Sequence, residues 1–415
     1  MRRLLIAALV AAPLLGATPS FLPAPGIPAA RANSVFAPGG LGEPSLEESA
    51  RIRALGGAGA AEHGPQSFSL VNPASIAEVE HLIIEGTVLP TYRRIQTADI
   101  GTETARETAF PSARALIRLP GRLVLGGAYL VGTSARFRID RAENAGTPST
   151  LRIDGTGGMD LIRLSLARRL SPTINAGLDY EIVAGSFREE WRREFADTAL
   201  ALTRDTLETS YTQRGRLRLG IQAIRGDWTL GAVYETPRDL PLQETQRTAG
   251  SRVSGPAGTL RIPSGYTVGL SAPISERLRA VGQYRRANWS RSSLASDLVD
   301  FRAMRRISLG LERRRASIAG IRAGLLDRVP LRVGATFLRW PDLLPVAGAS
   351  DISGGVAGVD EWAVSVGTGL QTQDRGGAID FSLEAGSRGS RDRLGASERF
   401  IRLGISLRVS DDTWK

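Results

Sequence analysis

Few residues of this sequence are of types that carry out catalysis. The chain has two histidines, His63 and His81, and no cysteine. A zinc site or a nucleophile–base pair needs several such side chains close together. Here His63 lies in a glycine-rich stretch, and His81 opens the first strand-like segment. We therefore predict no catalytic residue, no metal site, no cofactor and no enzymatic activity.

Two other motifs give no catalytic signal. The stretch GGAGAA at 56–61 lacks the spacing and the preceding strand of a dinucleotide-binding fingerprint. The acidic pair Glu189-Glu190 lies among arginines in FREEWRREF, which is typical of solvated charge. The unusual feature of the chain lies instead in its basic residues.

The 53 basic residues exceed the 42 acidic ones, and all but Lys415 are arginine. They form no run and no single helix face, so we predict no nucleic-acid partner. They alternate with aliphatic residues instead, as in RGRLRLGIQAI at 214–224 and FIRLGISLRVS at 400–410. A period of two indicates β-strands, because successive side chains of a strand point to opposite faces.

Two architectures give this alternation, a soluble β-sandwich and a membrane barrel. The predicted strands are often longer than the usual five or six residues of soluble strands, and their polar face is rich in Gly, Ser and Thr. We therefore favour an all-β fold, a transmembrane antiparallel β-barrel of about fourteen strands, an even number as expected of bacterial barrels. The predicted spans are 81–95, 110–119, 122–137, 151–168, 173–190, 205–224, 227–237, 263–273, 277–291, 300–314, 329–340, 360–373, 377–388 and 398–410.

The connections between spans alternate between short and long. Tight turns are predicted at 120–121, 171–172, 226–227, 275–276 and 375–377. Longer polar loops are predicted at 138–150, 191–204, 238–262 and 341–359. In such barrels the short turns face the periplasm and the long loops face outward.

Three parts of the chain are expected. The beginning, MRRLLIAALVAAPLLG, is typical of a secretory signal, with cleavage after Ala17 or, as we prefer, after Ala32. The predicted domains are the signal peptide 1–32, a plug or hatch at 33–80, and the barrel at 81–415.

The segment before the first strand is unusually rich in small residues. Gly56, Gly57 and Gly59 permit close backbone packing, and Asn72, Pro73 and Ala74 mark a turn. The same three residues also fit a helix start, with Asn72 as N-cap and Pro73 in the first turn. This glycine–alanine stretch followed by Asn-Pro-Ala resembles the hatch of FadL-type outer-membrane transporters of long-chain fatty acids and hydrocarbons, in which the hatch plugs a fourteen-stranded barrel.

The resemblance implies passive uptake of hydrophobic molecules, long-chain fatty acids or hydrocarbons, across the outer membrane of a Gram-negative bacterium. The expected partners are membrane lipids and lipopolysaccharide, a hydrophobic small-molecule ligand and the outer-membrane assembly machinery. Two alternatives remain at this stage: a barrel that serves protein secretion or surface attachment, and a general porin.

Two groups of wall residues are candidates for contacts with cargo. Lumen-facing arginines would hold an anionic head group or, alternatively, pair with acidic residues of neighbouring strands. These arginines are Arg163, Arg216, Arg218, Arg306, Arg332, Arg402 and Arg408. Gly86, Pro90, Gly126 and Gly127 would weaken strand pairing and open the wall sideways, or they would only relieve curvature.

Overall fold

The computed structural model describes residues 34–38, 41–97, 101–143, 148–197, 202–248, 250–294, 299–314, 329–347, 352–371 and 376–411. The chain divides into two units, Met1–Ala30 and Arg31–Lys415, and the described residues all belong to the second. The expected signal peptide therefore lies outside the described residues.

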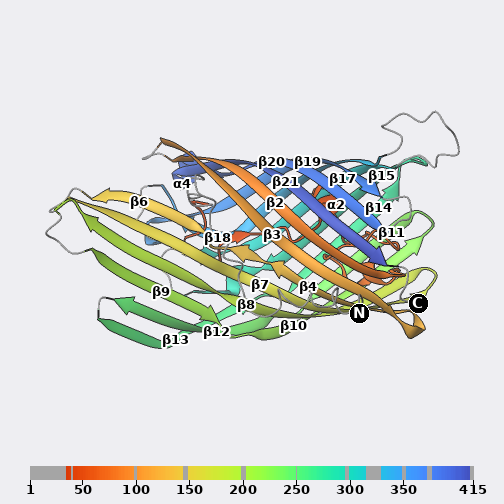
Figure 1. Ribbon diagram of the computed structural model, residues 1–415, viewed down its shortest axis with the longest axis horizontal. Helices are drawn as coiled ribbons and strands as arrows, with labels where there is room; N and C mark the ends of the chain where they lie inside the picture. The colour runs from red at the N-terminus through yellow and green to blue at the C-terminus, as the bar shows by residue number, and fades with distance from the viewer. Residues whose placement is uncertain are drawn as a thin grey trace, which may run out of the picture. The chain divides into compact units, whose positions relative to one another are not determined.

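Antiparallel strands form almost all of the regular structure (Figure 1). The strands of the main sheet are β2 (Leu82–Thr97), β3 (Gly101–Leu119), β4 (Leu123–Val131), β6 (Phe137–Glu143), β7 (Ser149–Ser171), β8 (Ile174–Phe195), β9 (Thr203–Tyr211), β10 (Arg214–Arg225), β11 (Trp228–Glu235), β12 (Arg238–Thr248), β13 (Ser251–Ile262), β14 (Gly265–Pro273), β15 (Leu278–Asn288), β16 (Asp300–Phe301), β17 (Ala303–Arg313), β18 (Leu331–Pro345), β19 (Val356–Gln371), β20 (Gly377–Ser390) and β21 (Ala396–Asp411).

The sheet closes on itself because β2 pairs with β3 on one side and with β21, the last strand, on the other. Five crossings are split into two strands each: β4 and β6, β9 and β10, β11 and β12, β13 and β14, and β16 and β17. The nineteen strands found among the described residues therefore make fourteen crossings. The prediction of a closed fourteen-stranded barrel is confirmed.

The two faces of the sheet differ as the alternation predicts. On β21 the exposed fraction is 39% for Leu403 and 55% for Leu407, but 9% for Arg402 and 2% for Ser406. A soluble sandwich would bury the aliphatic face. Here that face is outside and the polar face is inside, which is the arrangement of a barrel in lipid.

The connections agree with the sequence analysis only in part. The short turns at 120–122 and 226–227 are present, and Gly121 and Gly226 adopt positive φ in them. The predicted loop at 238–262 is wrong, because β12 and β13 form a paired hairpin through almost all of it. Strands β6, β7, β8 and β9 likewise extend into the predicted loops at 138–150 and 191–204. These polar stretches were predicted as loops, whereas the hairpins keep pairing beyond the length that a membrane crossing needs.

The remaining elements are short. They are β1 (Glu43–Pro44), β5 (Thr133–Ser134), α2 (Ala50–Arg53), α4 (Arg391–Leu394), and the 3-10 helices η2 (Pro73–Ile76), η3 (Pro120–Arg122), η4 (Trp289–Arg291) and η5 (Ile352–Gly354). Across the part of the chain that the structure describes, no helix is long and apolar enough to cross a membrane.

Candidate functional site

The residues that precede the barrel, 34–38 and 41–80, are called the N-terminal segment below. Its helix α2 contacts β19, β20 and β21, whereas η2 contacts β7, β8 and β10. These two groups of strands lie far apart in the order of the closed sheet. The N-terminal segment therefore passes through the lumen and contacts the wall on both sides.

The Asn-Pro-Ala motif joins the N-terminal segment to the wall. Asn72 is the N-cap of η2, and its Oδ1 accepts a hydrogen bond from the backbone N–H of Ala74 at 3.0 Å. Its Nδ2 donates to the carbonyl of Ala60 at 2.9 Å and to the carbonyl of Ile221 on β10 at 3.2 Å. Both interpretations of the motif are thus compatible, because Asn72 caps a short helix and also fixes the segment to the barrel.

Glycines of the wall face the N-terminal segment at its closest approaches. A Cβ on Gly334 of β18 would lie 2.1 Å from the backbone nitrogen of Gly56. In turn, a Cβ on Gly56, whose φ is +66°, would lie 2.4 Å from the carbonyl oxygen of Ala335. Backbone meets backbone here without side chains between them. The wall glycines next to the segment are Gly126, Gly177, Gly220, Gly231, Gly269, Gly310, Gly334, Gly367, Gly389 and Gly404.

The other two predicted hatch glycines contact residues within the N-terminal segment and on β15. A Cβ on Gly57 would lie 3.1 Å from the Leu46 side chain, and one on Gly59 would lie 2.2 Å from Oγ of Ser69. The backbone N–H of Gly59 also donates to Oε1 of Gln283 at 2.9 Å. A side chain would therefore clash at Gly56 and Gly59, and at Gly57 it would be tightly packed and strained by a φ of +85°.

Glutamates of the N-terminal segment pair with arginines of the wall. Oε2 of Glu43 accepts from Arg93 of β2 at 2.8 Å, and its Oε1 accepts from Arg388 of β20 at 2.7 Å and from Arg402 of β21 at 3.1 Å. Burial by itself raises the pKa of Glu43, but these three guanidinium groups outweigh it and hold the pKa well below its ordinary value. Glu43 is therefore a buried anion surrounded by cations.

The same pairing recurs at two other places. Glu47 accepts from Nη2 of Arg163 on β7 at 2.8 Å. Glu62 pairs with Arg279 of β15 and with Arg51 of the segment itself. Burial raises the pKa of Glu62, yet the two arginines lower it overall. Three carboxylates of the N-terminal segment thus bind to the wall at separate strands.

Carboxylates of the wall complete these ion pairs. Of the seven arginines proposed as head-group contacts, five have a wall carboxylate within 4 Å. The pairs are Arg163 with Glu181, Arg216 with Glu181 and Glu235, Arg218 with Asp179 and Glu235, Arg332 with Glu312 and Asp380, and Arg402 with Glu361 and Glu384. A buried charge is stable when it is paired and hydrogen-bonded, and these five meet that condition.

The other two arginines differ. Arg408 donates from Nη1 to the carbonyl of Gln66 in the N-terminal segment. Arg306 is 9% exposed and lies opposite Arg285 in the pairing of β15 with β17. No carboxylate of the described residues lies within ion-pair distance of Arg306. A head-group role for any of the seven stays a prediction.

A second part of the lumen is apolar. Inward side chains of β7, β8, β12 and β13, among other elements, pack into one buried cluster, called the apolar cluster below. Its members include Leu41, Leu130, Met159, Leu161, Val183, Phe187, Tyr211, Leu240, Leu242, Leu260, Ile262, Trp289 and Phe301. Because Leu41 belongs to it, the N-terminal segment also reaches this part of the lumen.

The wall is interrupted beside the apolar cluster. β3 pairs with β4 from Ser112 to Leu119, whereas its residues 101–109 pair only with β2. The next strand of that crossing, β6, pairs only with β7. Within the described residues, no pairing joins residues 101–109 of β3 to β6. The chain between β4 and β6 turns inward instead.

Residues 132–135 form this inward turn. Thr133 and Ser134 leave the main sheet and pair as β5 with Glu43 and Pro44 of the N-terminal segment. Ser45 also donates its backbone N–H to the carbonyl of Gly132 at 2.9 Å. The interruption of the wall and the N-terminal segment are therefore in direct contact.

The predicted opening residues lie elsewhere. Gly126 and Gly127 are paired on both sides, with β3 and with β7. Gly86 is likewise paired with β3 and β21, while Pro90 follows a register shift between Thr87 and Leu89. The interruption comes after Val131, on the same crossing as Gly126. The sequence carries a signal for it, because Gly132, Thr133 and Ser134 are turn residues within a predicted span.

The fold and the lumen define a class, a transmembrane β-barrel that holds a preceding segment inside it. Solved structures share this fold. They include the CymD monoaromatic hydrocarbon channel (TM-score 0.56, 15% identity, 88% of this chain and 97% of that one covered). A FadL homologue of Pseudomonas aeruginosa has a TM-score of 0.59 at 13% identity, with 87% and 98% covered. The toluene transporter TodX of Pseudomonas putida has a TM-score of 0.57 at 12% identity, with 88% and 99% covered.

These three structures show that the chain has the fold of FadL-type outer-membrane channels, as the resemblance of the N-terminal segment implied. No protein-family model and no curated protein sequence matches the chain.

Proposed function

We propose that the protein is an outer-membrane channel for passive uptake of hydrophobic small molecules, plugged by its N-terminal segment. The observation that carries this proposal is the position of the wall interruption, which lies beside the apolar cluster. An apolar molecule could rest among these side chains and reach the membrane without crossing the charged part of the lumen. The names of the similar structures, two of them hydrocarbon channels and one a FadL homologue, support the same class of cargo.

The route that we propose from the lumen to the membrane passes through the wall between residues 101–109 of β3 and strand β6. A hydrophobic molecule would gain little binding energy in the charged part of the lumen, where arginine and glutamate side chains pair with one another. The inward turn at 132–135 is held by Glu43, Pro44 and Ser45 of the N-terminal segment. A shift of that segment would therefore change the width of the opening.

The charge balance favours uncharged cargo. Five of the seven candidate arginines have carboxylate partners, so the cationic charge available to attract a fatty-acid head group is small. A general porin is also less compatible with the structure, because the N-terminal segment contacts both sides of the lumen. We assign no catalytic role. The outward aliphatic face would contact membrane lipids and lipopolysaccharide, and insertion would use the outer-membrane assembly machinery.

A reversible lock on the N-terminal segment tests this proposal. The Cβ of Ala50 lies 3.5 Å from the position of a Cβ on Gly404 of β21, a separation suitable for a disulfide. The variant A50C/G404C has no competing thiol, since the native chain has no cysteine. We expect uptake of a hydrocarbon such as decane to fall when the disulfide forms and to recover with reductant.

The single variants A50C and G404C are the controls, and neither should respond to reductant. Full uptake by the oxidised double variant would show that the segment does not gate the route. Large steady ion currents from the wild type in planar bilayers would instead indicate a porin.

A further inference from the structure

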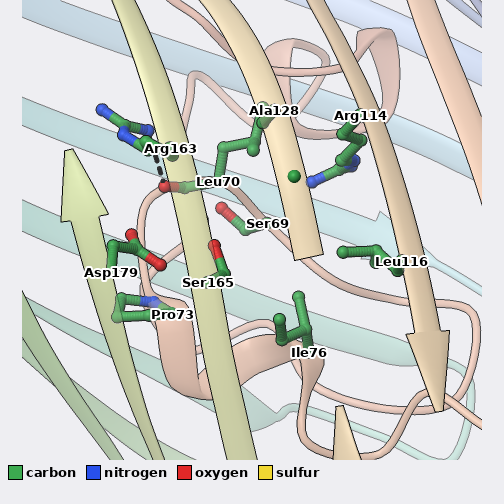
Figure 2. A pocket seen from close by; sticks show the side chains of 11 residues that line it. Ser69, Leu70, Pro73, Ile76, Arg114, Leu116, Ala128, Arg163, Ser165 and Asp179 are labelled. Atoms are coloured by element: carbon green, nitrogen blue, oxygen red, sulfur yellow. Dashed lines mark hydrogen bonds between the residues drawn. The ribbon is translucent and has the colours of Figure 1, made fainter. Parts of the chain in front are cut away.

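Arginines inside the barrel find acceptors within the protein. Nη1 of Arg163, for example, donates to the carbonyl of Leu70 at 3.1 Å, the hydrogen bond drawn in Figure 2. The same side chain also pairs with Glu47 and Glu181. A group of arginines on the lipid-facing side of the wall lacks such acceptors.

Arg286, Arg305 and Arg339 lie in one row across β15, β17 and β18. Arg305 is the register partner of Arg286 on one side and of Arg339 on the other. The next residue of β17, Arg306, is buried and faces the lumen, whereas Ile307, on the same face as Arg305, is 46% exposed. Register partners share a face of the sheet, so all three arginines point toward the lipid.

The positive charge of this row is not balanced within the protein. Neither Arg286 nor Arg305 has a side-chain hydrogen bond or an ion pair with any described residue. Nε of Arg339 lies 3.4 Å from Oδ1 of Asp360 without a hydrogen bond, and the same oxygen accepts from Arg302 at 2.6 Å. Like charges directly opposite each other destabilise a sheet, so the row calls for an anion from outside the chain.

No other carboxylate can serve the row from the neighbouring strands. The remaining acidic side chains of β14, β15, β17, β18 and β19 among the described residues are Glu312, Asp342 and Glu361, and all three are buried. Glu312 and Glu361 pair with lumen arginines. Asp360 is therefore the one carboxylate that the described parts of these strands present to the lipid.

The row lies at one edge of the apolar band of the barrel. On β17 the lipid-facing residues after Arg305 are Ile307, Leu309 and Leu311, and Arg313 ends the run. From Arg305 to Arg313 the strand spans about 26 Å, or about 20 Å of height at the usual tilt of about 40°. This height is of the order of the apolar band of such barrels, so Arg305 lies at the level of the lipid head groups.

The short turns show which leaflet these head groups belong to. β15 begins after the short turn at 274–277, and Arg286 lies near its opposite end. Short turns of outer-membrane barrels face the periplasm, so the row faces the outer leaflet. Lipopolysaccharide is the phosphorylated lipid of that leaflet.

Aromatic side chains lie beside the row on its membrane side. Tyr284, Phe337 and Trp362 share the row of Ile307, which is two residues nearer to the membrane centre than Arg305. Phe337 is 37% exposed and Trp362 is 56% exposed. Aromatic side chains gather where head groups meet acyl chains. The surface therefore fits a molecule with phosphate groups at one end and acyl chains at the other.

We propose that Arg286, Arg305 and Arg339 bind the phosphate groups of lipopolysaccharide. A guanidinium group binds phosphate through paired hydrogen bonds, and three adjacent strands spread the arginines over about 10 Å. This width favours a bisphosphorylated glycolipid, the anchor of lipopolysaccharide, over a phospholipid with a single phosphate. The inference goes beyond the proposed function, because it concerns the lipid-facing side and holds whether or not the barrel passes cargo.

The binding of three lipids tests the inference: bisphosphorylated lipid A, monophosphorylated lipid A and phosphatidylglycerol. Full-length protein refolded from inclusion bodies into detergent micelles carries no lipid from the cell membrane, and native mass spectrometry measures how much of each lipid binds. We expect bisphosphorylated lipid A to bind about tenfold more tightly than phosphatidylglycerol, with the monophosphorylated form between them, since each exposed ion pair adds a small increment.

The double variant R286Q/R305Q should lose this preference and bind all three lipids about equally. It also removes the repulsion within the row, so it should fold at least as well as the wild type. The matched control is R168Q/R225Q, which removes two exposed arginines at the opposite, short-turn ends of β7 and β10. The control should keep the tenfold preference.

Equal binding of the three lipids by the wild type would overturn the inference, and this measurement does not depend on the folding of any variant. An equal loss in the two double variants would also overturn it, because net charge rather than the row would then set the binding. Displacement of lipid A by excess inorganic phosphate would overturn it as well and would assign the row to a free anion.

Discussion

The lumen of this barrel has two parts that are held together by different forces. In the charged part, arginines of the wall and glutamates of the wall and the N-terminal segment form close ion pairs, as around Glu43. In the apolar part, leucines, aromatics and Met159 pack against one another, and the buried Asp342 beside them accepts a hydrogen bond from the backbone N–H of Leu41 at 3.3 Å. Ion pairs demand fixed geometry and exclude apolar molecules, whereas apolar packing can rearrange around a guest.

This difference separates structural roles from transport. The charged part fixes the N-terminal segment, because Glu43, Glu47 and Glu62 each bind a wall arginine. The apolar part adjoins the interruption after Val131, where the wall is not continuous. The first part therefore resists change, and the second part is suited to receive cargo.

The largest effect is expected where one arginine serves several carboxylates. Arg388 has a fully buried side chain and pairs with Glu43, Glu361 and Glu398. Arg388→Met would take one counter-ion from each of three buried carboxylates, which would then share only Arg93 and Arg402, so we expect the free energy of unfolding to fall by about 3–5 kcal/mol. Urea unfolding in micelles measures it. The double variant Arg388→Met/Glu398→Gln should recover part of the loss, and a loss below about 1 kcal/mol would contradict the role assigned to the charged part.

Truncating a side chain in the apolar part should lower the free energy of unfolding by less, and it should change the binding of hydrocarbons. Leu260 of β13 is fully buried in the apolar cluster. Leu260→Ala should lower the free energy of unfolding by about 2–3 kcal/mol, at the low end for buried leucines because the site can rearrange. It should also bind a bulkier hydrocarbon such as cyclododecane more tightly than the wild type does. The control is Leu219→Ala, a change on the outward face that leaves cyclododecane binding unchanged. Weaker binding by Leu260→Ala would show that the cluster is a rigid core.

The close approach of the N-terminal segment to the wall can be broken at a single glycine. Gly334→Val would push against the backbone of Gly56, so we expect a loss of about 1–3 kcal/mol and faster tryptic cleavage after Arg51 and Arg53. Gly282→Val is the matched control, because a Cβ there meets only Leu309 at 3.6 Å. Equal cleavage rates in the two variants would show that the segment does not depend on this contact.

Much of the fold was predictable because alternation reports strands directly. In RGRLRLGIQAI, Arg216 and Arg218 are buried while Leu217 and Leu219 are exposed, as the membrane interpretation requires. Turn residues such as Gly121 and Gly226 also fixed where several strands end. The loop prediction at 238–262 failed because alternation is weak there and the membrane thickness sets no limit on a hairpin beyond the lipid.

The lumen was less predictable because its contacts join residues far apart in sequence. Nothing local marks Glu43 as the partner of Arg388, or Gly334 as the neighbour of Gly56. Gly126 and Gly127 suggested a weak wall, yet they are paired on both sides. The unpaired region depends on the departure of Thr133 and Ser134 toward the N-terminal segment, which is a tertiary event.

The smallest predicted effect contrasts two buried carboxyl groups of the N-terminal segment. Burial raises the pKa of Glu48, whose Oε1 accepts from Ser69 at 2.8 Å and whose Oε2 has no partner among the described residues. Arginines instead lower the pKa of Glu43 despite its burial. The two groups should therefore respond to pH in opposite directions.

A raised carboxyl pKa contributes stability that is fully present below the unfolded value of 4.5 and is lost as the pH rises through the folded pKa. Glu48→Gln should therefore stabilise the segment at pH 7, by an amount on the order of 1 kcal/mol, and have no such benefit at pH 4. For Glu43 the contribution is present above pH 4.5 and is lost as the pH falls, so Glu43→Gln should destabilise the segment at pH 7. Hydrogen exchange of α2 amides at the two pH values measures both changes, after correction for the intrinsic exchange rate. A decrease in protection by Glu48→Gln at pH 7 would contradict this prediction. It would mean that Arg114 stabilises the ionised carboxylate of Glu48 by more than burial destabilises it.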